Sequence, residues 1–188
     1  DRERGWLTGE AARKQVHRLR AGADAIAVGI GTAIADDPAL TVRGVRKPRV
    51  APLRVVFDRA ARLPIGSQLA RSAKKSPVVM VTADPTGENA LALARKGVEP
   101  VEAQDLASAL LALHARGVHH LLVEGGAALA GALLGSNLVD RLVIFQAPVL
   151  LGTGSLGAFS AVPAAATSAL SRWRVVERRE FDDDLMTI

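Results

Sequence analysis

The chain has 188 residues, of which 49% are hydrophobic, and it carries a net charge of +5 at pH 7 with no cysteine. A chain of this size and apolar content can bury the core of one ordinary domain, and the lack of cysteine excludes disulfides and cysteine-ligated zinc. No apolar run reaches the roughly 18 residues of a membrane span, and the charged residues 1–4 predict no signal peptide, so we expect a cytoplasmic protein without a membrane partner.

The positive charge raises the question of nucleic-acid binding. Basic residues are densest in the stretch from 43 to 54, but only 3% of the residues are aromatic. Proteins that bind single strands usually stack bases on aromatic side chains, so we expect no nucleic-acid partner. An excess of arginine suits phosphorylated small molecules equally well, and a solvated basic face is the simplest alternative.

The first predicted element is a helix over residues 8–20, which Thr8 or Gly9 can cap and whose apolar face includes Val16 and Leu19. A short apolar run at 25–29, ending in glycine, predicts a buried strand.

Strands and helices then alternate along the chain. Strands are predicted at 53–58, 78–82, 98–101, 120–124 and 141–146, and helices at 88–96, 105–116 and 127–134. The tail predicts two strands, 173–181 and 185–188, joined by the acidic turn 182–184. This order favours an α/β fold with a mainly parallel sheet flanked by helices and a closing antiparallel hairpin. Nothing marks a boundary, so one domain over 1–188 is expected, with 42–52 as its most mobile loop.

Two glycine-bearing stretches, 24–43 (DAIAVGIGTAIADDPALTVR) and 121–134 (LLVEGGAALAGALL), each follow an apolar strand. Glycine there lets the backbone approach a ligand, and the next helix offers free N–H groups to an anion at the carboxyl end of the sheet. Gly29 and Gly31 form G-x-G, but Ile34 replaces the third glycine of the dinucleotide fingerprint. On pattern alone, an ordinary tight turn is an equally good interpretation.

Acidic residues stand at both stretches. Asp36 and Asp37 precede a proline, where carboxylates commonly make a turn or helix cap; alternatively one of them faces a pocket as a proton donor or ribose ligand. Glu124 ends an apolar strand beside Gly-Gly, where a charge is costly unless it is paired or used. Its alternative role is to pair with the dipole of the next helix.

Other chemistries lack their motifs. The four histidines show no metal-ligand spacing, and His119 and His120 are adjacent in a predicted strand, so their rings point to opposite faces. HExxH, G-x-S-x-G and GxxxxGK[ST] do not occur in the sequence. We therefore expect no metal and no serine nucleophile.

The combined motifs resemble a known family. WLTGxxARxxVHxLRA, GxGTxxADDPxLTVR, PLRVVFD, VEGGxxLxGALL and LVDRLVIFQAPVLLG occur in this order between residues 6 and 152. Together they are similar to the C-terminal reductase domain of the bifunctional deaminase–reductase of riboflavin biosynthesis. The resemblance implies a dihydrofolate-reductase-like fold.

The resemblance also implies an activity. The family's reaction is the NADPH-dependent reduction of 5-amino-6-(5-phosphoribosylamino)uracil, a phosphorylated pyrimidine riboside, to the ribitylamino product. A 2,5-diamino-pyrimidinone or pterin-like substrate, and a nucleotide-binding module without catalysis, are alternatives. Relatives are commonly dimers, and the apolar run 141–146 is one candidate interface for a homodimer.

The site residues that the resemblance implies fall into three groups. Cofactor contacts are expected at Trp6, Gly29, Gly31, Thr32, Asp36, Gly125, Gly126, Ala127, Ala128, Leu129, Ala130, Gly131 and Ala132. Substrate contacts are expected at Arg20, Leu40, Arg43 and Glu124, with both arginines suited to a phosphate. Asp36 and Glu124 are the candidate catalytic groups.

The resemblance is incomplete at the start of the chain. Relatives usually have an earlier strand that ends in a Ser-x-Asp-Gly-Arg-type turn, and this sequence begins after it. We therefore expect the sheet to lack an N-terminal strand. The zinc deaminase signature, H-x-E with P-C-x-x-C, does not occur either, so we expect no deaminase domain.

Overall fold

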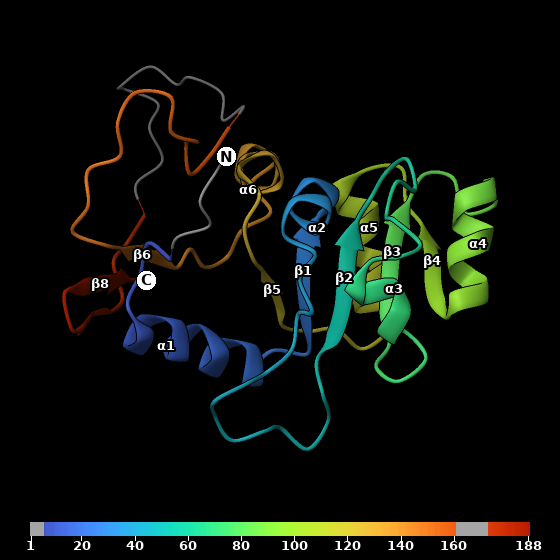
Figure 1. Cartoon of the computed structure of the whole chain (residues 1–188). Coiled ribbons are helices and arrows are strands. Elements are labelled where there is room, and N and C mark those ends of the chain that lie inside the picture. Colours follow the sequence, from blue (N-terminus) through green and yellow to red (C-terminus); the bar gives the residue numbers. More distant parts are fainter. Residues whose placement is uncertain (1–5, 161–172) are drawn as a thin grey trace.

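The computed structural model describes residues 6–160 and 173–188 and contains two sheets (Figure 1). The larger sheet has five parallel strands in the order β4-β3-β2-β1-β5. Their bounds are Ala25–Gly29 (β1), Leu53–Phe57 (β2), Val78–Thr82 (β3), Val98–Glu102 (β4) and Leu121–Val123 (β5). The predicted parallel sheet is confirmed, whereas the prediction of one domain over 1–188 includes residues outside the described ranges.

Helices cover both faces of this sheet because its strands are apolar on both sides. Ile26 and Val28 of β1 pack on one face with Leu69 and Leu93, while Ala25 and Ala27 pack on the other with Leu113. The helices concerned are α2 (Ile30–Asp36), α3 (Gln68–Ser72), α4 (Glu88–Lys96) and α5 (Leu106–His114). Alternation along a strand sends successive side chains to opposite faces, so the period of two produces two cores.

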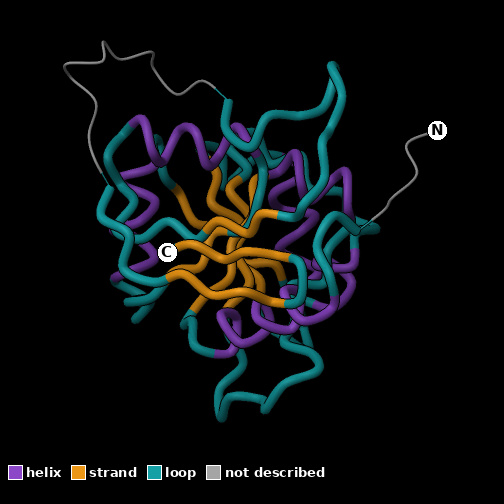
Figure 2. The backbone as a smooth tube through the Cα atoms, turned by 90° about the vertical axis from the view of Figure 1, so that its left-hand side faces the viewer, coloured by secondary structure: helices purple, strands orange, loops and turns teal. Residues whose placement is uncertain are grey.

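The smaller sheet is antiparallel, with strand order β6-β8-β7. It comprises β6 (Ile144–Gln146), β7 (Arg178–Phe181) and β8 (Asp184–Thr187). The closing hairpin is thus confirmed, but it belongs to a separate sheet, and both β6 and β7 begin later than predicted. Figure 2 looks onto this side of the molecule, with the strands of the larger sheet behind it.

The acidic turn was predicted one residue too long. Asp184 begins β8 and is 4% exposed, and its Oδ2 accepts a hydrogen bond of 2.6 Å from the N–H of Gly9. Gly9 precedes α1 (Glu10–Ala21) and has no side chain to cap it. A carboxylate held at the helix N-terminus supplies the missing acceptor and complements the helix dipole, which explains its burial.

An apolar groove of about 630 Å³ separates the two sheets. Val16 and Leu19 of α1 line it together with β5, and α6 (Ala127–Gly135) contributes Leu133. Neither β5 nor β6 pairs with a second strand on the groove side within the described residues. Glu124 also lines the groove. The expectation of a missing N-terminal strand stays a prediction.

Two short helices, α2 and α3, are not predicted by the sequence. They have seven and five residues, too few for a helical period to stand out. Among the helices of residues 6–160 and 173–188, none combines the length and apolar character needed to cross a membrane.

Candidate functional site

The two glycine stretches meet at the carboxyl ends of β1 and β5. These strands are parallel neighbours, so α2 and α6, which follow them, begin side by side (Figure 1). Gly126 has a φ of 84°, and a Cβ there would lie 3.0 Å from Thr32 Oγ1. A Cβ at Gly29 would lie 3.4 Å from the Cβ of Leu129. Glycine is therefore required at 126 both by its backbone conformation and by this close approach.

The N-terminus of α6 presents free donors. The N–H groups of Ala127, Ala128 and Leu129 find no acceptor within the described part of the chain, and the first helical bond runs from Ala130 to the carbonyl of Gly126. Free N–H groups at a helix start, together with the helix dipole, favour a bound anion. This end of α6 has the chemistry that a pyrophosphate needs.

The later residues of the same segment serve packing instead. Gly131 is buried, and a Cβ there would overlap the carbonyl oxygen of Ser160 at 1.7 Å. The N–H of Ser160 also donates to the carbonyl of Ala127 at 3.0 Å. Ala130 lines the groove, and Ala132 is exposed. Residues 125–129 therefore form the open end of α6, and the cofactor role of the whole predicted segment stays a prediction.

Arg20 and Glu124, both predicted substrate residues, form a two-pronged ion pair. Arg20 Nε donates to Glu124 Oε1 at 2.6 Å and Nη2 donates to Oε2 at 2.5 Å, while Nη1 donates to the carbonyl of Thr41 at 2.9 Å. Their side chains are 14% and 20% exposed. Glu124 thus pairs with α1 and not with the dipole of α6, and this pairing compensates the burial of its charge.

The segment from Leu40 to Arg43, which follows Asp36 and Asp37, runs alongside α1. Leu40 is 3% exposed, with a φ of 48°, and anchors the start of this segment in the core. The N–H of Arg43 donates to His17 Nδ1 at 3.2 Å. The Arg43 side chain is exposed and has no ion pair among the described residues, so its guanidinium is available to a ligand.

Sequence reasoning missed His17. Partial burial lowers the pKa of its imidazole below the ordinary 6.5, and the guanidinium groups of Arg20 and Arg43 lower it further. A signal did exist, because His17 and Arg20 are three residues apart on α1 and hence neighbours on its surface.

The two aspartates of the acidic pair have different surroundings. Asp37 Oδ1 accepts from the N–H of Gln68 at 2.7 Å and its carbonyl accepts from Gln68 Nε2 at 2.6 Å, so Asp37 holds the start of α3. The carboxylate of Asp36 is exposed and has no hydrogen bond or ion pair with any described residue. The turn-and-cap interpretation therefore describes Asp37, while the catalytic role of Asp36 stays a prediction.

For the remaining cofactor candidates, Trp6 and Gly31, the cofactor role stays a prediction. Trp6 is 80% exposed and stacks on the guanidinium of Arg13, whose carbon is 5.0 Å from the ring centroid. Trp6 precedes α1, whereas Arg20 lies in its last turn. Gly31 is exposed, with nothing within 4 Å of a Cβ placed on it. Within the described ranges, no hydrogen bond, ion pair or ring contact joins Trp6 or Gly31 to the substrate candidates.

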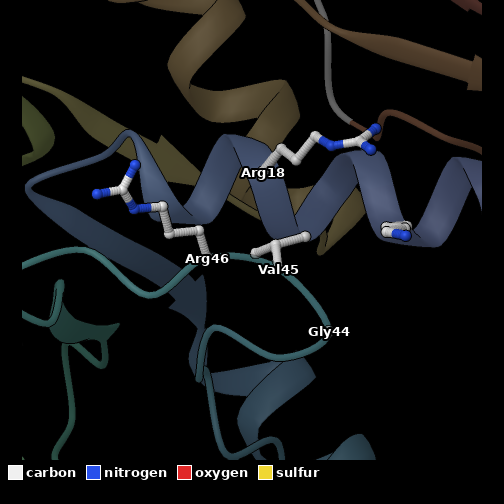
Figure 3. Close-up of a pocket in the computed structure, with 5 residues that line it drawn as sticks. Arg18, Gly44, Val45 and Arg46 are labelled. Carbon is white, nitrogen blue, oxygen red and sulfur yellow. The ribbon is translucent and has the colours of Figure 1, made fainter.

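A second, basic pocket of about 510 Å³ lies between α1 and the loop at Gly44–Arg46. It is lined by Lys14, Arg18 and Arg46. Figure 3 shows the side chains of Arg18 and Arg46 pointing away from one another, so these cations do not converge on one ligand position. Elsewhere in residues 6–160 and 173–188, no three His, Cys, Asp or Glu side chains are grouped so that they could hold a metal ion.

The chain is similar to several known proteins. The chain is 37% identical over 147 residues to the 2,5-diamino-6-ribosylamino-4(3H)-pyrimidinone 5′-phosphate reductase of Archaeoglobus fulgidus, covering 73% of this chain and 67% of that protein. The structure of Acinetobacter baumannii RibD superposes with a TM-score of 0.81 at 30% identity, covering 97% of this chain and 51% of that one.

A further solved structure carries a fuller description. A Thermotoga maritima protein described as a diaminohydroxyphosphoribosylaminopyrimidine deaminase/5-amino-6-(5-phosphoribosylamino)uracil reductase matches with a TM-score of 0.79 at 25% identity, covering 97% of this chain and 49% of that one. The chain thus spans about half the length of these two structures. The likeness confirms the dihydrofolate-reductase-like fold. The family model described as the RibD C-terminal domain matches residues 1–187, and the chain belongs to that family.

Proposed function

We propose that this chain reduces a phosphorylated pyrimidine riboside with NADPH, converting 5-amino-6-(5-phosphoribosylamino)uracil to its ribitylamino product. The observation that carries the proposal is one edge of the sheet, where free N–H groups of α6 lie beside a strand end that bears the Arg20–Glu124 pair. Relatives named as pyrimidine reductases support it.

The cofactor side fits a dinucleotide. Gly125 and Gly126 both have positive φ, and the close approach of Gly126 to Thr32 leaves no room for a side chain between α2 and α6. The donors at 127–129 would hold the pyrophosphate, and when bound the reduced nicotinamide would supply a hydride. The protein's own contribution is to bind and orient both molecules.

The substrate side requires a cation and an acid. The guanidinium of Arg43 would bind the phosphate, and the Arg20–Glu124 pair would contact the ribose or the pyrimidine. In the reaction, C1′ of the ribose gains a hydride, its bond to the ring oxygen breaks, and that oxygen gains a proton. The exposed carboxyl of Asp36 would donate this proton.

The direct test is to mix the protein, NADPH and the deaminated substrate, and to follow the absorbance of the reduced nicotinamide. The absorbance of the reduced nicotinamide is expected to fall only when the protein, NADPH and the substrate are all present. A full-length protein that binds both ligands but consumes no NADPH would refute the proposal and leave a binding module without catalysis.

Two variants separate the roles. Asp36→Asn is expected to lower kcat more than it weakens NADPH binding; an equal loss of both would contradict the acid role. Arg43→Ala is expected to raise the substrate KM by removing a charge-assisted contact worth about 1.5–3 kcal/mol. An unchanged KM would mean that Arg43 does not contact the substrate.

A second substrate is favoured by one specific observation. The archaeal relative at 37% identity is named as the reductase of the 2,5-diamino-pyrimidinone, the substrate before deamination. The two compounds differ at the pyrimidine, so comparing kcat/KM for both separates them. A higher kcat/KM for the diamino compound would replace the first proposal with the second.

A further inference from the structure

We infer that His17 is a positioning residue of the proposed substrate site. Its ring holds the backbone of Arg43 against α1 and so fixes the place from which the Arg43 guanidinium meets a phosphate. The inference rests on the proposed function for its kinetic consequence, but the contact itself is independent of any substrate. The resemblance to the reductase family assigned no role to His17.

Three attachments hold the segment from Leu40 to Arg43. Leu40 is buried in the core, the carbonyl of Thr41 accepts from Arg20 Nη1 at 2.9 Å, and the N–H of Arg43 donates to His17 Nδ1 at 3.2 Å. Arg20 and His17 are neighbours on α1, so one face of this helix holds the segment by two hydrogen bonds, at Thr41 and at Arg43. Because Arg20 also pairs with Glu124, these hydrogen bonds connect Arg43 to the rest of the candidate site.

The His17 contact is the last of these attachments along the chain. Residues 44–52 make no hydrogen bond or ion pair with any other part of the described chain, and the next bond is that of Leu53 N–H to the carbonyl of Asp24. Figure 3 shows Gly44 to Arg46 passing beside α1. If the His17 contact were lost, Arg43 would join this unrestrained stretch, and binding a phosphate would then require ordering it.

The contact depends on the protonation of the ring. Nδ1 accepts a hydrogen bond only while it is unprotonated, since an imidazolium has no acceptor. Burial and the guanidinium groups of Arg20 and Arg43 lower the pKa of His17 below 6.5, against the opposing influence of Glu124 and the Thr41 carbonyl. The ring is therefore neutral at pH values above 6.5, and the contact is lost as the pH falls through the lowered pKa.

The test compares the wild type with His17→Leu and His17→Asn between about pH 5 and pH 8. Leucine offers no acceptor, so the substrate KM should rise about fivefold at neutral pH with kcat unchanged. The amide oxygen of asparagine reaches the position of Nδ1 but does not titrate, so this variant should keep the wild-type KM at neutral pH. Lys14→Ala, one turn earlier on α1, is the matched control and should leave KM unchanged.

The pH dependence of the substrate KM separates the protonation of the His17 ring from that of the substrate. The substrate phosphate titrates near pH 6, so KM will change with pH in every variant. We expect an additional rise in KM at low pH in the wild type, which His17→Asn should lack. The inference is wrong if His17→Leu keeps the wild-type KM, or if the wild type and His17→Asn share one profile.

A second measurement keeps the inference testable if the proposed substrate is not turned over. The protection factor of the Arg43 amide, its hydrogen-exchange rate relative to that of an unstructured peptide at the same pH, should be high in the wild type at neutral pH and in His17→Asn. It should be lower in His17→Leu and in the wild type at low pH. Equal exchange in all three proteins would refute the His17 contact, whereas absence of turnover with intact Arg43 protection would refute only the proposed function.

Discussion

β1 and β5 lie side by side in one sheet, yet they stand in different surroundings. Ile26 of β1 is fully buried, whereas Leu122, its partner in register on β5, is half-buried and lines the groove. β1 has a strand on each side, while β5 has β1 on one side and the groove on the other. The molecule thus has two regions. Strands β1–β4 form a closed half that provides stability, whereas α1, β5 and α6 form a half-open side that carries the candidate site.

The largest expected effect tests this comparison directly. Ile26→Ala should lower the free energy of unfolding by about 2–5 kcal/mol, because it leaves a cavity in a closed core. Leu122→Ala, its partner in register, should cost clearly less because it already borders a groove. Urea denaturation of both variants provides the measurement. Equal losses would mean that β5 is as firmly packed as β1.

A substitution at Gly126 tests whether α2 and α6 are tightly packed against one another on the half-open side. Gly126→Ala should lower the free energy of unfolding by about 1–2 kcal/mol, because its φ of 84° disfavours a side chain and a Cβ would lie 3.0 Å from Thr32 Oγ1. Gly31→Ala, in the first turn of α2 with open space around it, is the matched control and should stabilise the protein slightly. Thermal unfolding that ranks the two variants in the opposite order would show that α2 and α6 are not in close contact.

The adjacent aspartates allow a smaller test at the border of the two halves. Asp37→Ala should destabilise the protein by about 1 kcal/mol, since it removes the acceptor at the start of α3. Asp36→Ala should change stability by less than about 0.5 kcal/mol, because its carboxylate has no partner among the described residues. A substantial loss of stability in Asp36→Ala would reveal a structural role and weaken the case for catalysis.

Asp24 joins the starts of β1 and β5, and its effect should be the smallest and depend on pH. The N–H groups of His120 and His119 hold the pKa of Asp24 below 3.8. Its contribution to stability is therefore present above pH 3.8 and disappears as the pH falls through the lowered pKa. The melting temperature of Asp24→Asn should lie below that of the wild type at neutral pH and approach it in acid. A constant difference would exclude this linkage.

Much of the closed half could be predicted from local sequence. The apolar run of β3 (Val78–Thr82) and the helix α4 (Glu88–Lys96), which ends at Gly97, have the predicted bounds because strand composition and a glycine C-cap are local signals. The short α2 and α3 give no such signal. Asp184 was misplaced because a run of acids resembles a turn, and its partner Gly9 is distant in the chain.

The candidate site was predictable as a set of residues but not as a set of contacts. Glu124 stood out as a charge at the end of an apolar strand, yet spacing could not show that its partner is Arg20, 104 positions away. The spacing of His17 and Arg20 on α1 was a weaker signal, because it could not show that the N–H of Arg43, 26 positions away, bonds to the His17 ring. Contacts between distant segments arise from the fold, and no local pattern encodes them.

The hydrogen bond between Gly9 and Asp184 also has a consequence for the timing of folding. The two residues are 175 positions apart, and Phe181 and Met186 pack with Ala12 in the same region. During synthesis the start of α1 therefore waits for almost the whole chain before it gains its cap and its apolar cover. Contacts of such high sequence separation are slow to form, so we expect the β1–β4 half to become ordered first and the end that carries α1 to dock last.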